Sequence, residues 1–474
     1  MVSCTKRTNR NAAFTRFRKG CMEESIRKEY FELLRFRSIG AEPDALRACA
    51  DCALWWKKWL SNLEFTAELI LPPIKNGVAA PPIVWAERKG TEGAPTLLFY
   101  GHYDVQPADP LDAWETPPFE PTEKEGRIYC RGAQDDKGQS FAFMCGVRDF
   151  LNAPRQANRP VPTLKVVLEG QEESGSAALS ALAPDLRRRL AADILLVCDT
   201  NAAAGLRPAI VAGLRGVCHF TVRLTGPARD LHSGEYGGIA PNPAQGIAAL
   251  VASLHNPDGS IAVKGFMDGI IPPTAEEFAA AEAGMPDAAT FAAEIGCPPE
   301  GGAEGHSLAA RNAFEPTIEV NGIHSGYAGA GSKTIIPSGA FAKISMRLVP
   351  GQTPRRAFDA VKTHLEARVP RGLTLAFEEW SPGAGGFRLP LASPVFRLAQ
   401  QVLEEMDPRG PVFQWEGASI PVISLLREVS GAAPLIVGWG QPGDRIHAPN
   451  ESYGWDQFAQ ARAWGSRIVA EWGV

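Results

Sequence analysis

At residues 96–104 the chain carries the stretch TLLFYGHYD, in which a mainly apolar run is followed by a glycine, a histidine and an aspartate. A run that is apolar throughout is typical of a strand buried on both faces of a sheet. Three later runs have the same design and also lead to acidic or histidine residues. They are 164–168 before Glu172 and Glu173, 194–198 before Asp199, and 435–437 before His447.

Helical patterns separate these runs, over residues 138–151 and 177–191, and another helical stretch precedes them over 23–63. This alternation predicts an α/β domain with a mixed, largely parallel sheet sandwiched by helices. In such sheets ligands bind beyond the carboxyl ends of the strands. We therefore expect the four runs to bring their acidic and histidine residues to one edge of the sheet.

The middle of the chain has a different texture, with alternating strand patterns over 217–224, 317–320 and 340–348 and helical patterns over 243–254 and 354–368. These features predict an inserted α+β domain, with residues 256–312 as a surface excursion. The expected organisation is a basic tail at 1–21, a catalytic domain at 22–214 and 385–474, and the insert at 215–384.

Length and composition limit the class of protein. A chain of 474 residues is too long for one ordinary core, and a net charge of −5 gives no reason to expect nucleic acid or a membrane as partner.

The first 21 residues are basic and contain no acidic residue. We expect a disordered tail there, with an organelle transit peptide as the alternative. The nine scattered cysteines, with Cys49 and Cys52 as a lone pair, favour a reducing compartment, and we expect the cytoplasm.

Paired carboxylates are the strongest chemical signal. Asp135 and Asp136 stand before a predicted helix, and Glu172 and Glu173 follow a predicted strand. The first pair could simply cap a helix. Adjacent acids at the end of an apolar strand repel each other unless cations or protons neutralise them. One such feature is explained by a cap or a solvated loop, but all of them together indicate a metal site.

The combined motifs resemble those of the M20 metallopeptidases, a family that includes carnosinase-like dipeptidases, carboxypeptidases, aminoacylases and desuccinylases. The resemblance covers the chain from about Met22 onward. The motifs that carry it occur in the family's order: His102-x-Asp104, Asp135-Asp136-Lys137-Gly138, Glu172-Glu173-Ser174-Gly175-Ser176, Asp199, Asp230-Leu231-His232-Ser233-Gly234 and Ile446-His447.

The resemblance implies two divalent metal ions, with zinc as the first expectation and manganese or cobalt as alternatives. His102, Asp135 and Asp199 would bind one ion. Asp135, Glu173 and His447 would bind the other, so that Asp135 bridges the pair. Asp104 would orient His102, and Glu172 would be the general base for a metal-bridging water. The peptide between Asp135 and Asp136 is cis in relatives.

The insert resembles the family's lid and dimerisation domain, so a homodimer through residues 215–384 is implied. Within it His232 would reach the partner subunit's site and Arg347 would hold the substrate carboxylate. Thr334, Gly417 and Ser419 match neighbouring substrate contacts. The alternative for Arg347 is a surface ion pair.

The implied reaction is hydrolysis of dipeptides or short peptides with a free C-terminal carboxylate, and the motifs look closest to the carnosinase-like branch. An N-acyl-amino-acid amidohydrolase with the same site is the alternative. A non-catalytic metal-binding relative should have lost Glu172 or a ligand, and none is missing. Three departures, at Trp415, Ala418 and Gly443, bear on specificity rather than on the reaction.

Overall fold

The structure is a computed structural model that describes residues 23–74, 79–154, 160–417 and 420–472. The described chain divides into two compact units. The first runs up to Ile210 and includes Ala392–Val412 and the residues from Leu426 onward, and the second comprises Val211–Leu391 and Phe413–Leu425. The predicted basic tail lies outside the described residues. Among those described, no helix combines the length and apolar character needed to cross a membrane.

A mixed sheet forms the centre of the first unit. The strands of this sheet that lie wholly within the first unit are β1 (Thr66–Ile70), β2 (Ile83–Arg88), β3 (Thr96–His102), β6 (Thr163–Glu169), β7 (Ile194–Val197) and β17 (Ala433–Ile436), in the spatial order β1-β2-β6-β3-β7-β17. Strand β3 is parallel to β6 and β7, and β17 is parallel to β7. Within this set only β2 is reversed, because it runs antiparallel to both of its neighbours, β1 and β6. The structure thus confirms the predicted, largely parallel sheet and its four central runs.

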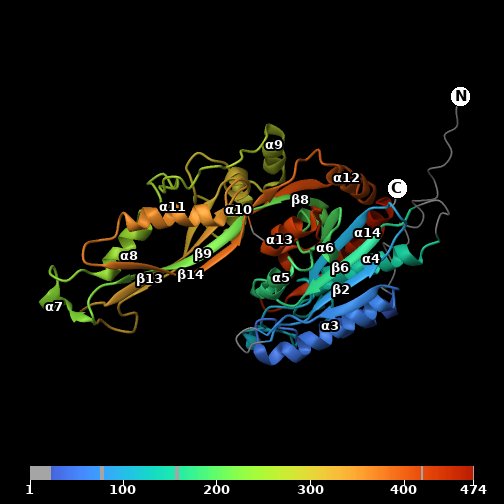
Figure 1. Ribbon diagram of the computed structural model, residues 1–474, viewed down its shortest axis with the longest axis horizontal. Coiled ribbons are helices and arrows are strands. Elements are labelled where there is room, and N and C mark those ends of the chain that lie inside the picture. The colour runs from blue at the N-terminus through green and yellow to red at the C-terminus, as the bar shows by residue number, and fades with distance from the viewer. Residues whose placement is uncertain (1–22, 75–78, 155–159, 418–419, 473–474) are drawn as a thin grey trace. The chain divides into compact units, whose positions relative to one another are not determined.

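The connections explain why helices cover both faces of this sheet. Helix α4 (Lys137–Asn152) links β3 to β6, whereas α5 (Ala177–Leu182) and α6 (Arg187–Leu190) link β6 to β7. These two crossovers run in opposite directions across the sheet, so right-handed connections place them on opposite faces (Figure 1). The single helix predicted over 177–191 is wrong, because Pro184 interrupts it.

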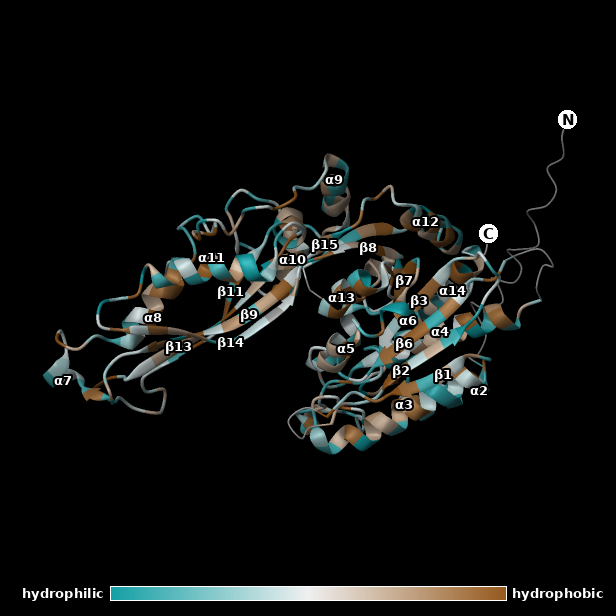
Figure 2. Cartoon of the chain, in the orientation of Figure 1, coloured by the Kyte–Doolittle hydropathy of each residue, from teal (hydrophilic) through white to brown (hydrophobic). Residues whose placement is uncertain are grey.

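Four more helices belong to the first unit. Helix α14 (Trp455–Glu471) packs along α4 and also contacts α12 (Pro394–Met406). Helices α2 (Glu24–Leu34) and α3 (Leu46–Ser61) are separated by a turn at Pro43. Trp55, Trp56 and Trp59 of α3 all contact the ring of Phe141 in α4. The interior of the unit is therefore apolar and rich in aromatic rings, and Figure 2 shows the central strands largely in the hydrophobic colours.

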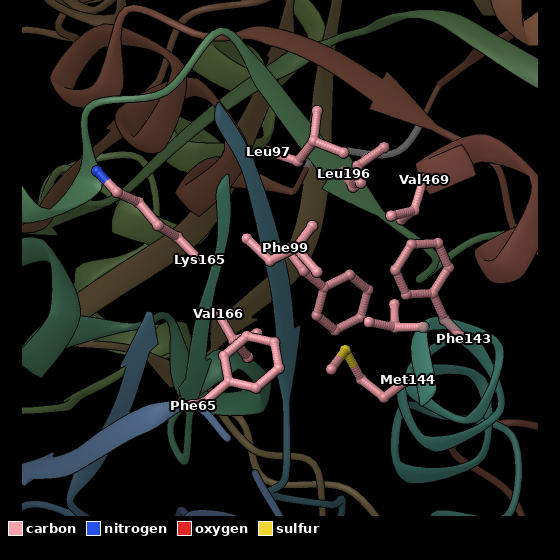
Figure 3. A pocket seen from close by; sticks show the side chains of 11 residues that line it. Phe65, Leu97, Phe99, Phe143, Met144, Lys165, Val166, Leu196 and Val469 are labelled. Atoms are coloured by element: carbon pink, nitrogen blue, oxygen red, sulfur yellow. The ribbon is translucent and has the colours of Figure 1, made fainter. Parts of the chain in front are cut away.

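Figure 3 shows a small pocket in this interior, lined by 11 side chains that are almost all apolar. Phe99 of β3 and Phe143 of α4 stack there with ring centroids 4.7 Å apart. The one charged lining residue, Lys165, donates a hydrogen bond of 2.6 Å to the carbonyl of Ala191. The lining consists of Phe65 and of residues of β3, β6, β7, α4 and α14 that are mostly buried, so the pocket is a gap in the core packing.

A four-stranded antiparallel sheet forms the second unit. It has the order β11-β13-β9-β14, from β9 (Gly216–Thr225), β11 (Thr317–Ser325), β13 (Gly339–Leu348) and β14 (Thr374–Ala384). Alternate residues of β9 and β13 point into a core that helices α8 (Pro243–Ala252) and α11 (Pro354–Glu366) complete. Strands β9, β11 and β13 and both helices were predicted. Strand β14 was not.

The predicted excursion between residues 256 and 312 contains α9 (Ala275–Gly284) and α10 (Ala288–Ile295) and runs into a short π-helix, Ala310–Phe314. The ring of Phe314 contacts both Phe278 of α9 and Trp415 of β16 (Val412–Glu416). This aromatic column fixes the end of the excursion within the second unit. Short strands β10 (Leu231–His232) and β12 (Ile335–Ile336) pair elsewhere in this unit.

Candidate metal centre

The four parallel strands of the first unit deliver the predicted side chains to one edge. His102 is the last residue of β3, Glu172 and Glu173 lie in a turn just after β6, and Asp199 follows β7 by two residues. His447 lies in the loop after β17. These strands point the same way, so their carboxyl ends meet, as expected of a ligand site in an α/β sheet.

Two groups of three side chains meet here and share one residue. His102, Asp135 and Asp199 place one ligand atom each within 4.8 Å of one another, and Asp135, Glu173 and His447 do the same. Asp135 uses both carboxylate oxygens, with Oδ1 3.2 Å from Nε2 of His102 and Oδ2 2.9 Å from Nε2 of His447. The arrangement has the form of a two-metal site bridged by Asp135.

The chemistry of this donor set fits divalent metal ions. His102 is 1% exposed, yet its Nε2 has no hydrogen-bond partner among the described residues. That nitrogen lies 3.2 Å from Asp135 and 3.7 Å from Asp199 without hydrogen-bonding geometry to either. A buried nitrogen facing two carboxylates is costly unless a cation or a proton lies between them. One imidazole and two carboxylates per ion suit zinc, manganese or cobalt.

The electrostatics of the site demand positive charge. Burial alone would lower the pKa of His102, but Asp104, Asp135 and Asp199 raise it well above its usual value. Hydrogen bonds to Asp135 and Glu173 raise the pKa of His447 to about 10. Burial, followed by the charge of Asp135, raises the pKa of Glu173. The carboxylates thus favour cationic neighbours, a need that metal ions would meet.

Glu172 stands beside both groups and belongs to neither. Burial raises its pKa to about 9, and the charges of Asp199, Glu173 and Asp135 act in the same direction. A carboxylate in such surroundings has a strong affinity for a proton. Glu172 therefore has the position and the basicity of a proton acceptor.

Asp104 does more than was predicted for it. Its backbone carbonyl lies 3.1 Å and its Oδ1 3.4 Å from Nδ1 of His102, so the expected contact with the histidine is present. Its two carboxylate oxygens also accept the backbone N–H groups of Glu172 and Glu173, each at 3.2 Å. One fully buried carboxylate therefore contacts His102 and the turn that carries Glu172 and Glu173.

The Asp135–Asp136 peptide is cis, as the resemblance implies. The carboxylate of Asp136 belongs to neither ligand group. Its Oδ2 accepts hydrogen bonds from the Ser140 hydroxyl at 2.6 Å and from the His102 backbone N–H at 3.2 Å. Gly101 leaves room for this contact, because a Cβ there would lie 2.1 Å from Ser140 Oγ. Asp136 thus ties the start of α4 to the end of β3.

Two supporting residues were not predicted. Gln106 donates from Nε2 to Oε2 of Glu173 at 2.8 Å, and the buried carboxylate of Glu451 accepts backbone N–H groups from the turn before Asp136. Both occur within a few residues of predicted ligands, His102 and His447. This proximity in the sequence was the one feature that could have indicated Gln106 and Glu451, but it does not show which atoms these two side chains contact.

The remaining predicted residues lie in the second unit. His232 and Thr334 are neighbours there, because β10 pairs with β12 and the Ser233 N–H donates to the Thr334 carbonyl. Both side chains are exposed. Nδ1 of His232 accepts the N–H of Gly234 at 3.0 Å, so a neutral ring carries its proton on Nε2. His232 therefore presents a donor outward.

Arg347 lies near the end of β13 and is partly exposed. Burial lowers its pKa. The nearby Arg215 donates from Nε to the Gly417 carbonyl at 2.9 Å and from Nη1 to the carbonyls of Arg311 and Glu315. Burial, and then the charge of Arg347, lowers the pKa of Arg215 to about 10. Ser419 lies outside the described residues.

Of the three departures, Trp415 has a packing role, Gly443 has none, and Ala418 lies outside the described residues. Trp415 is 6% exposed and packs on Phe314, so it belongs to the aromatic column of the second unit. A Cβ on Gly443 would meet no neighbour within 4 Å. The structure gives no reason for glycine at that position.

The chain is similar to named dipeptidases over most of its length. The family model described as peptidase family M20/M25/M40 matches residues 98–471. A β-Ala-His dipeptidase of Rattus norvegicus is 31% identical over 421 residues, covering 84% of this chain and 80% of the relative. A Cys-Gly metallodipeptidase of Schizosaccharomyces pombe is 31% identical over 396 residues, 80% of each chain.

Solved structures show the same fold. An M20 family metallo-carboxypeptidase from Sulfolobus solfataricus superposes with a TM-score of 0.82 at 27% identity, covering 95% of this chain and all of the other. Human carnosine dipeptidase 1 superposes with a TM-score of 0.75 at 24% identity, over 95% and 97% of the two chains. The family match over residues 98–471 and the two relatives at 31% identity show that the chain belongs to peptidase family M20/M25/M40.

Proposed function

We propose that this protein is a di-metal dipeptidase that cleaves dipeptides or short peptides with a free C-terminal carboxylate. One observation carries the proposal: Asp135 is shared by two groups of ligand atoms, and Glu172 lies beside both without belonging to either. This is the arrangement that two-metal hydrolysis of an amide requires.

The relatives support a peptide substrate. The rat and fission-yeast relatives, each 31% identical to this chain, are both dipeptidases. The N-acyl-amino-acid amidohydrolase considered as the alternative is not favoured, because neither of these relatives is one. We therefore propose a dipeptide with a free N-terminal amino group as the substrate class.

His102, Asp135 and Asp199 would hold one ion, and Asp135, Glu173 and His447 the other, with zinc as the first expectation and manganese or cobalt as alternatives. Two bound divalent ions supply Lewis-acid polarisation of the scissile carbonyl and lower the pKa of water. Asp104 holds His102 and the Glu172–Glu173 turn in register through its contacts with both. Ligand geometry thus depends on a residue that binds neither ion.

Glu172 would move the proton. Its carboxylate would take a proton from the attacking water and give it to the leaving amine. The pKa of about 9 applies without cations, and two positive charges nearby would lower it toward the working pH. The same burial that raises the pKa lets Glu172 hold the proton between the two transfers.

We further propose that residues 215–384 form a lid and dimerisation domain. Strand β11 is an edge of its four-stranded sheet, and its Val320 and Ile323 are 37% and 52% exposed. An exposed apolar edge strand is a ready surface for pairing with another chain. His232 would then stabilise the oxyanion in the partner subunit's site, and Arg347, Thr334, Gly417 and Ser419 would bind the substrate. We place the enzyme in the cytoplasm.

Hydrolysis of a dipeptide panel by chelated protein, before and after adding zinc, manganese or cobalt, tests the proposal. We expect metal-restored cleavage of unblocked dipeptides and little cleavage of N-acyl amino acids. Turnover of N-acyl amino acids alone would overturn the substrate class. Sedimentation tests the dimer, and a stable, active monomer would remove the role given to His232.

A further inference from the structure

The carboxylate of Glu451 is fully buried and accepts four hydrogen bonds. Its Oε1 accepts the backbone N–H groups of Gln134 at 2.9 Å and Asp135 at 3.1 Å. Its Oε2 accepts the N–H of Gly132 at 3.0 Å and Nη1 of Arg131 at 2.7 Å. One side chain therefore fixes the backbone of the whole turn that ends in the bridging Asp135.

Arg131, which pairs with Glu451, is itself held in place by further contacts. Its guanidinium is 1% exposed, donates from Nη2 to the Pro107 carbonyl and lies over the ring of Trp114. A buried ion pair holds its geometry well only when further hydrogen bonds satisfy both partners. Glu451 is fully satisfied, since each of its oxygens has two donors, whereas Nε of Arg131 has no hydrogen-bond partner among the described residues.

Glu451 also lies in the loop that carries His447, another ligand of the group that contains Asp135 and Glu173. Glu451 follows His447 by four residues, in a loop where Arg445, His447 and Asn450 all have positive φ. The backbone carbonyl of Glu451 accepts the N–H of Cys130, so its main chain and its side chain both bind the 130–135 segment. Glu451 thus joins the segment of Asp135 to the loop of His447.

We propose that Glu451 is a positioning residue for the ion held by Asp135, Glu173 and His447. The other group depends on it less, because His102 ends β3 and Asp199 follows β7, and Glu451 contacts neither. Loss of the Glu451 carboxylate should therefore weaken metal binding by Asp135, Glu173 and His447 more than metal binding by the other group. The inference rests on the proposed two-metal function.

Glu451→Gln is the sharpest perturbation, because it keeps the size and one acceptor of the side chain. The new amide group has two N–H donors, and whichever way it points it faces two donors where an oxygen stood. A donor left without an acceptor in a buried site destabilises that geometry. Glu451→Asp keeps the charge beside Arg131 but is one methylene too short to serve all four donors.

Asp149→Asn is the matched control. Asp149 pairs with Nε and Nη2 of Arg462 at 2.6 and 2.8 Å and joins α4 to α14. It lies 13 residues beyond Asp136 along the chain, or about 20 Å along α4. The control loses an Arg–carboxylate pair of the same unit without touching the ligand turn.

The test is titration of the metal-free full-length proteins with Co²⁺, followed by calorimetry and by the visible absorption of bound cobalt, with thermal melting in parallel. Wild type and Asp149→Asn should each bind two ions, and at each site the affinity of the variant should equal that of the wild type. Glu451→Gln should bind one ion normally and the second about 10- to 100-fold more weakly, and Glu451→Asp should show a smaller loss at the same site.

Wild-type affinities at both sites of Glu451→Gln would overturn the proposal, even if its melting temperature falls. An equal loss of Co²⁺ affinity at both sites would overturn the claim that Glu451 acts mainly on one of them. If Glu451→Gln does not fold, Glu451→Asp decides by the same criteria. A wild type that binds no Co²⁺ would instead refute the two-metal function itself, so the two failures are distinguishable.

Discussion

Replacing Asp104 by asparagine tests how the catalytic turn is held. The two carboxylate oxygens accept the N–H groups of Glu172 and Glu173, each at 3.2 Å, from a fully buried position. Asparagine keeps one acceptor and turns a donor toward the other N–H. A hydrogen bond to a charged group contributes about 1.5–3 kcal/mol. The lost bond should therefore cost about 2–3 kcal/mol in the alignment of Glu172 and Glu173.

At about 1.4 kcal/mol for each tenfold change in rate, this loss corresponds to about a 30- to 150-fold fall in kcat/KM. The assay is steady-state dipeptide hydrolysis with zinc in excess, so that weaker metal binding does not limit the rate. Asp149→Asn serves as the control for stability and should keep the wild-type kcat/KM. A variant at residue 104 that stays within threefold of wild type would refute this account of the turn.

Three further predictions follow from named contacts. Arg347→Ala should raise KM for dipeptides about tenfold or more while leaving that for dipeptide amides nearly unchanged, because the lost guanidinium would bind the C-terminal carboxylate; steady-state kinetics on the paired substrates checks this. Gly101→Ala should lower the melting temperature and the activity, because its Cβ would lie 2.1 Å from Ser140 Oγ, an overpacking that typically costs about 1–3 kcal/mol. Glu169→Gln should gain stability relative to wild type as pH rises from 5 to 8. Burial raises the pKa of Glu169 to about 7, so wild-type folding loses about 1.4 kcal/mol per pH unit between the unfolded and folded pKa values, and denaturant titrations of the metal-free proteins at several pH values should show the difference.

The sequence was most informative about site residues whose position depends on the strand that precedes them. The apolar runs that lead to His102, Glu172, Asp199 and His447 are continuous and short, so both the strands and the polar segments after them could be located. Parallel order then follows from the intervening helices. Local pattern and topology together were enough to predict that these residues meet.

Contacts that depend on the third dimension could not be predicted. Glu451 lies more than 300 residues from the turn that it binds, with nothing in the local sequence to pair them. Strand β14 was missed because its register with β9 shifts twice and Glu379 has positive φ, so its side chains do not alternate cleanly. The split between α5 and α6 at Pro184 should have been foreseen, because proline ends helices.

Glu172→Gln tests the central claim most directly. The variant and the wild type would be stripped with a chelator, reloaded with zinc, counted for bound metal and assayed on one dipeptide. The account predicts two ions per chain in both proteins and a fall in kcat of about 10²- to 10⁴-fold in the variant, because glutamine cannot accept the proton. A variant that binds two ions and still turns over the dipeptide at the wild-type rate would contradict the account.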